Sequence, residues 1–183
     1  MYRRFSISVL IPCYNEEKGI VEVLNGMPEF IDEVIVVDNG STDRSSVFAE
    51  EKGAIVIYEK RRGYGRAYKT GLSNVRGDII ATLDGDGQHP SKSIAPIIDY
   101  ILDEKFDFIS ASRFPLKNSG SMSFRNILGN KIQTYTMRIL FGCKIMDWQS
   151  GMWVFKRSIL DYLKLTGNGM SFSEEIKIEA IKH

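Results

Sequence analysis

Two aspartates separated by a single residue, Asp84 and Asp86, are the side chains in this sequence best suited to chemistry. They follow the apolar run Ile79–Leu83, and glycines stand between and after them, so both carboxylates can turn toward one hard cation. Oxygen ligands suit Mg²⁺ or Mn²⁺, which commonly bridge to substrate phosphates and help a diphosphate to leave. The alternative is a plain acidic turn, since Asp-Gly is common in turns. Because Gln88 and His89 continue the motif after a predicted strand, the pattern favours the metal site.

His89 has two interpretations. It could ligate the ion, but Pro90 restricts the backbone of His89 toward extended geometry. We therefore expect a structural, hydrogen-bonded histidine rather than a metal ligand.

A second polar cluster, Asp38–Asp43, follows the apolar run Val34–Val37. At a strand end, Asp38 could accept hydrogen bonds from a ribose or a base, while Ser41 and the next helix N-terminus offer donors to an anion. The alternative is that Asp38 and Asp43 only cap that helix. The residues themselves leave both interpretations open.

A third segment, Pro12–Glu16, follows the first apolar run of the chain. Tyr14 could stack or pack against a nucleoside, and Glu16 could bind its polar edge. Taken alone, the segment also fits an ordinary helix start with an acid in the first turn.

The first half of the chain alternates short, nearly continuous β-branched runs with helical patterns. The predicted strands are Ser6–Ile11, Glu33–Val37, Ala54–Tyr58, Ile79–Leu83 and Phe106–Ser110. The predicted helices are Glu17–Met27, Thr42–Lys52, Tyr64–Asn74 and Ser91–Leu102. Ser41 or Thr42 could cap the second helix, and Ser91 the fourth.

This alternation predicts an α/β fold: a Rossmann-like open twisted sheet, mostly parallel, with helices on both faces. Ligands in such sheets bind beyond the carboxyl ends of the strands. The polar segments described above all follow predicted strands, as does the glycine-containing stretch Lys60–Arg66. We therefore expect the functional site at that edge of the sheet.

Length and composition fit one domain spanning residues 1–183, because 183 residues, 43% of them hydrophobic, can bury one substantial core. A formal net charge of +1 argues against a dedicated nucleic-acid binder.

Cys13 and Cys143 form no CxxC pair, so we expect two buried free thiols in a reducing compartment. No stretch approaches the ~20 apolar residues of a membrane span. The terminal segment SFSEEIKIEAIKH fits a helix that stops without the Gly or Pro that usually ends a helix. We therefore expect that further residues follow it in the natural protein.

Two further elements are expected in the second half. Apolar residues recur at helical spacing within residues 124–141, with Arg125, Lys131 and Arg138 on the other face. Packing of this stripe on the core is the simpler interpretation. The alternative is a helix on a membrane surface, its basic face toward lipid phosphates. Gly151–Phe155 predicts another strand, antiparallel, that continues the sheet.

Together, these segments resemble glycosyltransferase family 2, whose members have the GT-A fold. Three motifs occur in family order: Pro12-x-Tyr14-Asn15-Glu16, Val37-Asp38-x-Gly40-Ser41 and Asp84-x-Asp86-x-Gln88-His89. Within the family, the sequence is most similar to dolichyl-phosphate mannose synthases and related polyprenyl-phosphate glycosyltransferases. The segments that carry this likeness are Arg62–Leu72, Ser110–Phe114 and Asp147–Met152. Asn39 departs from the family, which often has an acid there, and this leaves the base and sugar preference open.

The resemblance implies that residues near the strand ends bind a sugar nucleotide. Those implied to contact the donor are Pro12, Tyr14, Glu16, Asp38, Arg66 and Asp84. An Mg²⁺ or Mn²⁺ ion held by Asp84, Asp86 and Gln88 would carry the diphosphate, which makes Asp86 a catalytic candidate.

The resemblance also implies an acceptor site. Arg113 and Arg125 match family arginines that receive the acceptor's phosphate, a task that suits the paired donors of guanidinium. A lipid phosphate oxygen is already ionised at neutral pH, so positioning would suffice. A sugar hydroxyl would need a proton acceptor, and Asp147 is the candidate, with orientation of its own turn as the alternative role.

The predicted reaction is attack by an acceptor oxygen on the anomeric carbon, with inversion and release of a nucleoside diphosphate. The first hypothesis is a metal-dependent polyprenyl-phosphate glycosyltransferase that uses a UDP- or GDP-sugar at the cytoplasmic face of a membrane. The second keeps the chemistry but transfers to a polysaccharide or protein-glycan hydroxyl. The third is a non-catalytic nucleotide-sugar-binding module. A nucleotidyltransferase ranks last, because the expected Gly-rich basic loop is missing after the first predicted strand.

Overall fold

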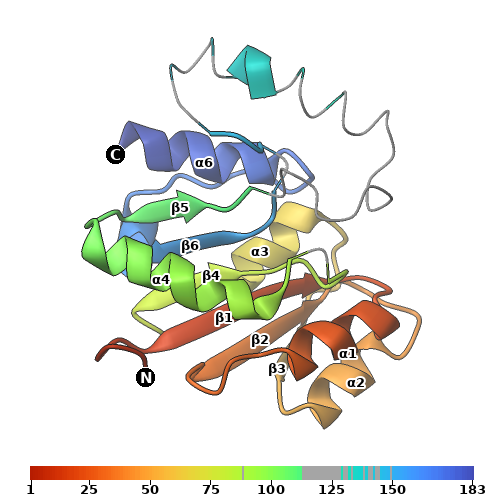
Figure 1. The fold of residues 1–183 in the computed structure, drawn as a ribbon. Helices are drawn as coiled ribbons and strands as arrows, with labels where there is room; N and C mark the ends of the chain where they lie inside the picture. The colour runs from red at the N-terminus through yellow and green to blue at the C-terminus, as the bar shows by residue number, and fades with distance from the viewer. Residues whose placement is uncertain are drawn as a thin grey trace.

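A computed structural model describes residues 1–87, 89–112, 129, 132, 134–137, 139, 142, 145–148 and 150–183. In this part of the chain, one sheet has the strand order β3-β2-β1-β4-β6-β5 (Figure 1). The strands are β1 (Ile7–Cys13), β2 (Glu33–Asp38), β3 (Ile55–Tyr58), β4 (Ile79–Thr82), β5 (Phe108–Ser110) and β6 (Trp153–Lys156).

The sheet is parallel on one side and antiparallel on the other. Strand β1 pairs in parallel with both β2 and β4, and β2 pairs in parallel with β3. Strand β6 is antiparallel to β4 and β5, which confirms the antiparallel strand predicted near Gly151–Phe155, although it begins at Trp153. Because the chain order turns at β1, the carboxyl ends of β1, β2 and β4 open the crevice where such sheets bind ligands.

Helices cover both faces of the sheet, as the sequence predicts (Figure 1). The helices are α1 (Glu17–Asn25), α2 (Ser45–Glu51), α3 (Tyr64–Leu72), α4 (Ile94–Asp103) and α6 (Phe172–Lys182), with 3₁₀ turns at Ser91–Ser93 and Arg157–Asp161. One hydrophobic cluster joins the sheet to α1, α2 and α4, and the other joins it to α3 and α6. The predicted α/β architecture is therefore confirmed.

Neighbouring residues of β1 explain why its apolar run is continuous. Val9 and Ile11 belong to the first cluster, whereas Leu10 belongs to the second with Tyr68 of α3 and Phe172 of α6. Successive side chains of a strand point to opposite faces, so a strand covered on both sides needs an apolar residue at each position. All five of these side chains are fully buried.

Two predicted helix caps are wrong. Helix α2 begins at Ser45 rather than Thr42, because Oδ1 of Asp43 accepts the Ser45 N–H at 3.0 Å and so supplies the first side-chain partner. Ser91 lies in a 3₁₀ turn before α4, and its Oγ donates to the Val23 carbonyl oxygen at 2.7 Å. The Asp43 contact is local and fits the alternative in which Asp43 caps this helix, whereas the Ser91 contact joins segments that are far apart in the sequence.

The helix expected over residues 124–141 lies mostly outside the described residues. Its described members are helical, yet Ile132, Tyr135 and Ile139 are 59%, 69% and 64% exposed. Core packing of the stripe is therefore wrong for these three side chains. No helix within the described ranges is long and apolar enough to cross a membrane. Cys13 is a buried free thiol, as expected, and Cys143 lies outside the described residues.

Candidate functional site

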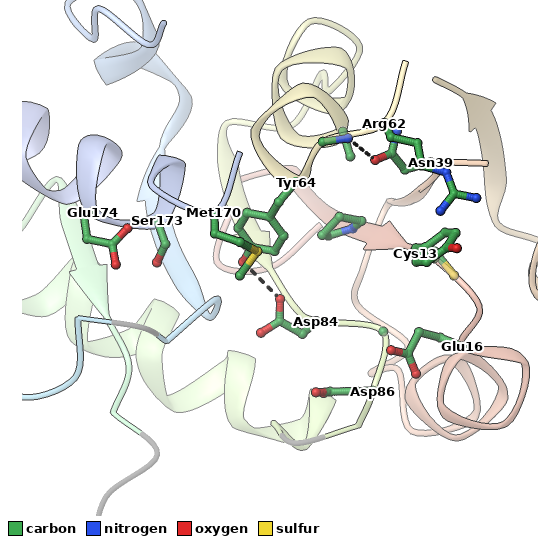
Figure 2. A pocket seen from close by; sticks show the side chains of 15 residues that line it. Cys13, Glu16, Asn39, Arg62, Tyr64, Asp84, Asp86, Met170, Ser173 and Glu174 are labelled. Atoms are coloured by element: carbon green, nitrogen blue, oxygen red, sulfur yellow. Dashed lines mark hydrogen bonds between the residues drawn. The ribbon is translucent and has the colours of Figure 1, made fainter. Parts of the chain in front are cut away.

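A cavity of about 630 Å³ opens at the carboxyl ends of the parallel strands (Figure 2). This volume is in the range that holds small-molecule ligands and cofactors. Its wall includes four of the residues implied to contact the donor, Pro12, Tyr14, Glu16 and Asp84, together with Asp86, which is implied to hold the metal ion. The structure therefore brings together the first and the third of the three motifs.

The loops after β1 and β2 are locked to each other by hydrogen bonds between side chains and backbone. Asn15 has a positive φ of 54°; its N–H donates to Ser41 Oγ at 3.0 Å, and its Oδ1 accepts the Thr42 N–H at 2.8 Å. The Glu16 N–H donates to Ser45 Oγ at 2.8 Å. The backbone that carries Tyr14 and Glu16 to the cavity is thus fixed by the start of α2.

The turn that carries Asp84 and Asp86 is held by two close approaches that only glycine permits. A methyl group at Gly19 would lie 2.3 Å from the Gly85 carbonyl oxygen, so α1 packs directly on the turn. A methyl group at Gly151 would lie 2.3 Å from Oδ2 of Asp84. Real Cβ atoms do not approach so closely, so both glycines help to fix the two carboxylates.

Tyr64, at the start of α3, donates its hydroxyl proton to Oδ1 of Asp84 at 3.2 Å (Figure 2). Burial, and then the charge of Asp84, raise the pKa of the Tyr64 hydroxyl well above its usual value. The phenol therefore stays a donor at any physiological pH. Sequence reasoning noted the stretch around Tyr64 but gave this residue no role.

The cavity is strongly acidic. Its described lining residues include the carboxylates of Glu16, Asp84, Asp86 and Glu174, against the single cationic side chain of Arg62. Burial raises the pKa of Glu16, and the negative charges of Asp86 and Asp43 add to this effect. Such a wall would repel a diphosphate unless a cation lay between them.

Asp84 and Asp86 suit a divalent cation of the Mg²⁺ or Mn²⁺ type. No group of three acidic, histidine or cysteine side chains forms a complete cage within the described ranges. Mg²⁺ is commonly bound by one or two carboxylates and completes its octahedron with waters and substrate phosphates. An acidic cavity with two adjacent aspartates fits that arrangement better than a closed structural metal site.

One side of the cavity was not predicted. Met170, Ser173 and Glu174 line it from the start of α6, on the side away from Arg62 in Figure 2. The Gly65 N–H donates to the Gly169 carbonyl oxygen at 3.2 Å, which joins the starts of α3 and α6. An acid in the first turn of the last helix is visible in the sequence, but only this packing brings it to the cavity.

Asp38 lies behind the cavity wall rather than on it. Its side chain is 4% exposed; Oδ1 accepts the Ser41 N–H at 2.8 Å, and Oδ2 accepts the Ser46 hydroxyl proton at 2.9 Å. Its neighbour Asn39 lines the cavity instead. These bonds, one of them to Ser46 in the first turn of α2, fit the interpretation of Asp38 as a cap of that helix, and its contact with a nucleoside stays a prediction.

Asp147 and Arg66 are also absent from the described cavity wall. Asp147 is 1% exposed and lies in the segment that Lys177 of α6 anchors. The Lys177 ammonium is buried and donates to the carbonyl oxygens of Trp148 and, at 3.0 Å, Ser150. This burial fits the structural role of Asp147, and its role as a proton acceptor stays a prediction.

His89 is 6% exposed, and its Nε2 lies 3.2 Å from Ser150 Oγ. This placement confirms a structural, hydrogen-bonded histidine. Gln88, Arg113 and Arg125 lie outside the described residues, so their implied contacts with metal and acceptor stay predictions.

The sequence is similar to known sugar transferases over most of its length. The profile of Glycosyl transferase family 2 matches residues 8–163. A low-salt glycan biosynthesis hexosyltransferase of Haloferax volcanii is 31% identical over 182 residues, which cover 96% of this chain and 44% of that protein. A UDP-N-acetylglucosamine–dolichyl-phosphate N-acetylglucosaminyltransferase of Methanococcus voltae is 31% identical over 180 residues, covering 86% of this chain and 72% of that protein.

The fold has a solved counterpart. Glucosyl-3-phosphoglycerate synthase from Mycobacterium tuberculosis, in complex with Mn²⁺, UDP-glucose and phosphoglyceric acid, matches with a TM-score of 0.78 at 24% identity. The match covers 98% of this chain and 66% of that one, and it confirms the GT-A type of fold. The chain spans only 44% and 59% of the length of two Haloferax volcanii relatives, so the comparison concerns part of those proteins.

Proposed function

Because the chain belongs to glycosyl transferase family 2, we propose that it transfers a sugar from a nucleotide-diphosphate sugar to a polyprenyl phosphate, with inversion at the anomeric carbon. The observation that carries the proposal is the meeting of Asp84 and Asp86 with Tyr14 and Glu16 on the wall of one cavity. The carboxylates that would hold a metal ion and its diphosphate thus lie beside an aromatic ring and an acid that suit a nucleoside.

A divalent cation at Asp84 and Asp86 would neutralise the diphosphate and favour its departure. In this arrangement Tyr64 holds Asp84 in place through its hydroxyl group. Glucosyl-3-phosphoglycerate synthase from Mycobacterium tuberculosis has been solved with UDP and either Mn²⁺ or Mg²⁺, which supports the choice of ion. The same neighbours favour UDP over GDP as the nucleotide of the donor.

The names of two relatives support a polyprenyl phosphate acceptor. One is the dolichyl-phosphate N-acetylglucosaminyltransferase of Methanococcus voltae, and the other is a dolichyl-phosphate hexose transferase of Haloferax volcanii, 29% identical over 88% of this chain. An acceptor of this kind requires access to a lipid surface. The exposed side chains of Ile132, Tyr135 and Ile139 support a peripheral contact with the cytoplasmic face of a membrane, because their spacing places them on one side of a helix.

A glycan hydroxyl is the second candidate acceptor, favoured by Glu174 alone. This carboxylate lines the cavity on the side opposite Arg62 and could accept the proton that a hydroxyl must lose. A phosphate oxygen needs no such base. The effect of changing Glu174 on sugar transfer therefore distinguishes a hydroxyl acceptor from a phosphate acceptor.

The test is transfer of radiolabelled sugar from UDP- and GDP-sugars, with Mn²⁺, to polyprenyl phosphate and to a soluble oligosaccharide. We expect label in the lipid extract, its loss in Asp86→Ala, and its retention in Glu174→Gln. Label confined to the oligosaccharide and lost in Glu174→Gln would assign the hydroxyl acceptor instead. Nucleotide binding without label in either acceptor would indicate the non-catalytic module.

A further inference from the structure

Asn39 binds three backbone groups of the loop between β3 and α3 with one side chain. Its Nδ2 donates to the carbonyl oxygens of Glu59 and Arg61, each at 3.0 Å, and its Oδ1 accepts the Gly63 N–H at 2.7 Å. The side chain is 8% exposed, so water does not easily replace these partners. Residue 39 therefore sets the path of residues 59–63.

Only a primary amide satisfies all three partners. An amide offers two N–H donors and one carbonyl acceptor, whereas a carboxylate accepts hydrogen bonds and donates none. Aspartate at position 39 would place a negative oxygen against the carbonyl oxygens of Glu59 and Arg61 and remove the amide that donates to both. The amide at this position is thus a specific requirement of the loop, and not a neutral replacement for an acid.

The loop carries Arg62 to the cavity. The guanidinium carbon of Arg62 lies 4.1 Å from the centre of the Tyr14 ring, and its Nη2 donates to the Gly40 carbonyl oxygen at 3.2 Å. Both side chains line the cavity, and 44% of Tyr14 is exposed. Figure 2 shows Asn39 and Arg62 together on the side of the cavity away from Glu174.

The start of the loop is also anchored independently of Asn39. Glu59 accepts hydrogen bonds from the Arg61 N–H at 2.8 Å and from the Thr70 hydroxyl at 2.8 Å, which ties the start of the loop to α3 without Asn39. Loss of the Asn39 bonds should therefore release the segment around Arg62 while the strand and helix on either side stay folded.

We propose that Asn39 is a positioning residue for the donor: it holds Arg62 on Tyr14, and the stacked pair forms the wall against which the nucleoside lies. The cavity then has an acidic end, at Asp84 and Asp86, for the ion and diphosphate, and a cationic–aromatic end for the base. The inference rests on the proposed function, because the nucleoside is that of the sugar-nucleotide donor.

The test uses Asn39→Asp, Arg62→Ala and the double variant, with Asn25→Asp as a control that adds the same charge at an exposed position. The affinity for UDP and GDP is measured by calorimetry with Mn²⁺, and hydrogen exchange is followed over residues 59–63. Each single change should weaken nucleotide binding about two- to fivefold, a size typical of a cation–π contact at an exposed site. The double variant should lose no more than Arg62→Ala alone, because Asn39 acts through Arg62.

Steady-state kinetics separate positioning from general loss of structure. Asn39→Asp should raise the donor KM while leaving kcat close to that of Asn25→Asp. It should lower the melting temperature, because two carbonyl oxygens lose their donor, yet only residues 59–63 should exchange faster. Unchanged exchange, or losses that add in the double variant, would overturn the inference even where the wild type binds nucleotide. Failure of the wild type to bind either nucleotide contradicts the proposed function, whereas the exchange result still decides whether Asn39 holds the loop.

Discussion

The Asp84 carboxylate lies directly against Gly151: a methyl group at position 151 would be 2.3 Å from Oδ2 and 2.4 Å from Oδ1 of Asp84. This contact joins the turn after β4 to the segment that leads into β6. The antiparallel half of the sheet therefore fixes a side chain that the sequence assigns to metal binding.

Gly151→Ala should displace the Asp84 carboxylate. We expect Mn²⁺-dependent nucleotide binding to weaken roughly 10- to 100-fold, as when a residue that orients a metal ligand is lost. Calorimetric titration measures this loss. Gly26→Ala is the matched control, because a methyl group there meets nothing closer than 3.5 Å. Equal affinities in the two variants would contradict the account of the turn.

Glu16→Gln should stabilise the free protein and weaken donor binding. Because the pKa of Glu16 is raised by burial and by the charges of Asp86 and Asp43, the carboxyl group costs stability increasingly as the pH rises from its unfolded-state pKa through its folded-state pKa. The variant should melt at a higher temperature than the wild type at pH ~7.5, and the two should converge at pH ~4, near the unperturbed carboxyl pKa. Glu29→Gln, a change at an exposed acid, should show neither effect.

Much of the fold is predictable because it follows from local patterns. The apolar runs that become β1, β2 and β4 are continuous since both faces of the sheet are covered there. The rule that ligands bind beyond the carboxyl ends of parallel strands then places Asp84 and Asp86 beside Tyr14 and Glu16. The observed strand ends differ from the predicted ones by at most two residues, because the pairing register, and not the apolar run, ends a strand.

The rest of the site depends on contacts between distant segments. Glu174 reaches the cavity only because the start of α6 docks on the start of α3. Asn39 lines the cavity, while Asp38 accepts hydrogen bonds from Ser41 and Ser46. The sequence motif alone does not show which of two adjacent polar residues reaches the cavity. Asp147 is a candidate proton acceptor in the sequence, yet it is buried beside the Lys177 anchor.

Glu59→Gln should lower stability at neutral pH, with a difference that shrinks in acid. Hydrogen bonds from Arg61, and then from Thr70, lower the pKa of Glu59 to about 2. A carboxyl group with a depressed folded-state pKa stabilises the fold above its unfolded pKa and loses that contribution as the pH falls toward about 2. Urea unfolding at pH ~7 and pH ~3 tests this prediction. A difference independent of pH would mean that the charge of Glu59 plays no part.

Lys177→Met should destabilise the protein by about 1–3 kcal/mol, because it removes the buried ammonium that donates to the carbonyl oxygens of Trp148 and Ser150. Lys164→Met removes an exposed ammonium of the same length and should cost much less. Chemical unfolding of both variants gives the comparison. Equal stabilities would show that the ammonium does not hold the segment from Asp147 to Ser150.

The most direct test of the account is calorimetric titration of UDP and GDP into the wild type and Asp86→Asn, each with and without Mn²⁺. We expect one of the two nucleotides to bind the wild type only when the ion is present, and the exchange of one carboxylate for an amide to weaken that binding at least about tenfold. Nucleotide binding that is equally tight without the ion, or unchanged in Asp86→Asn, would contradict a metal–diphosphate site at Asp84 and Asp86.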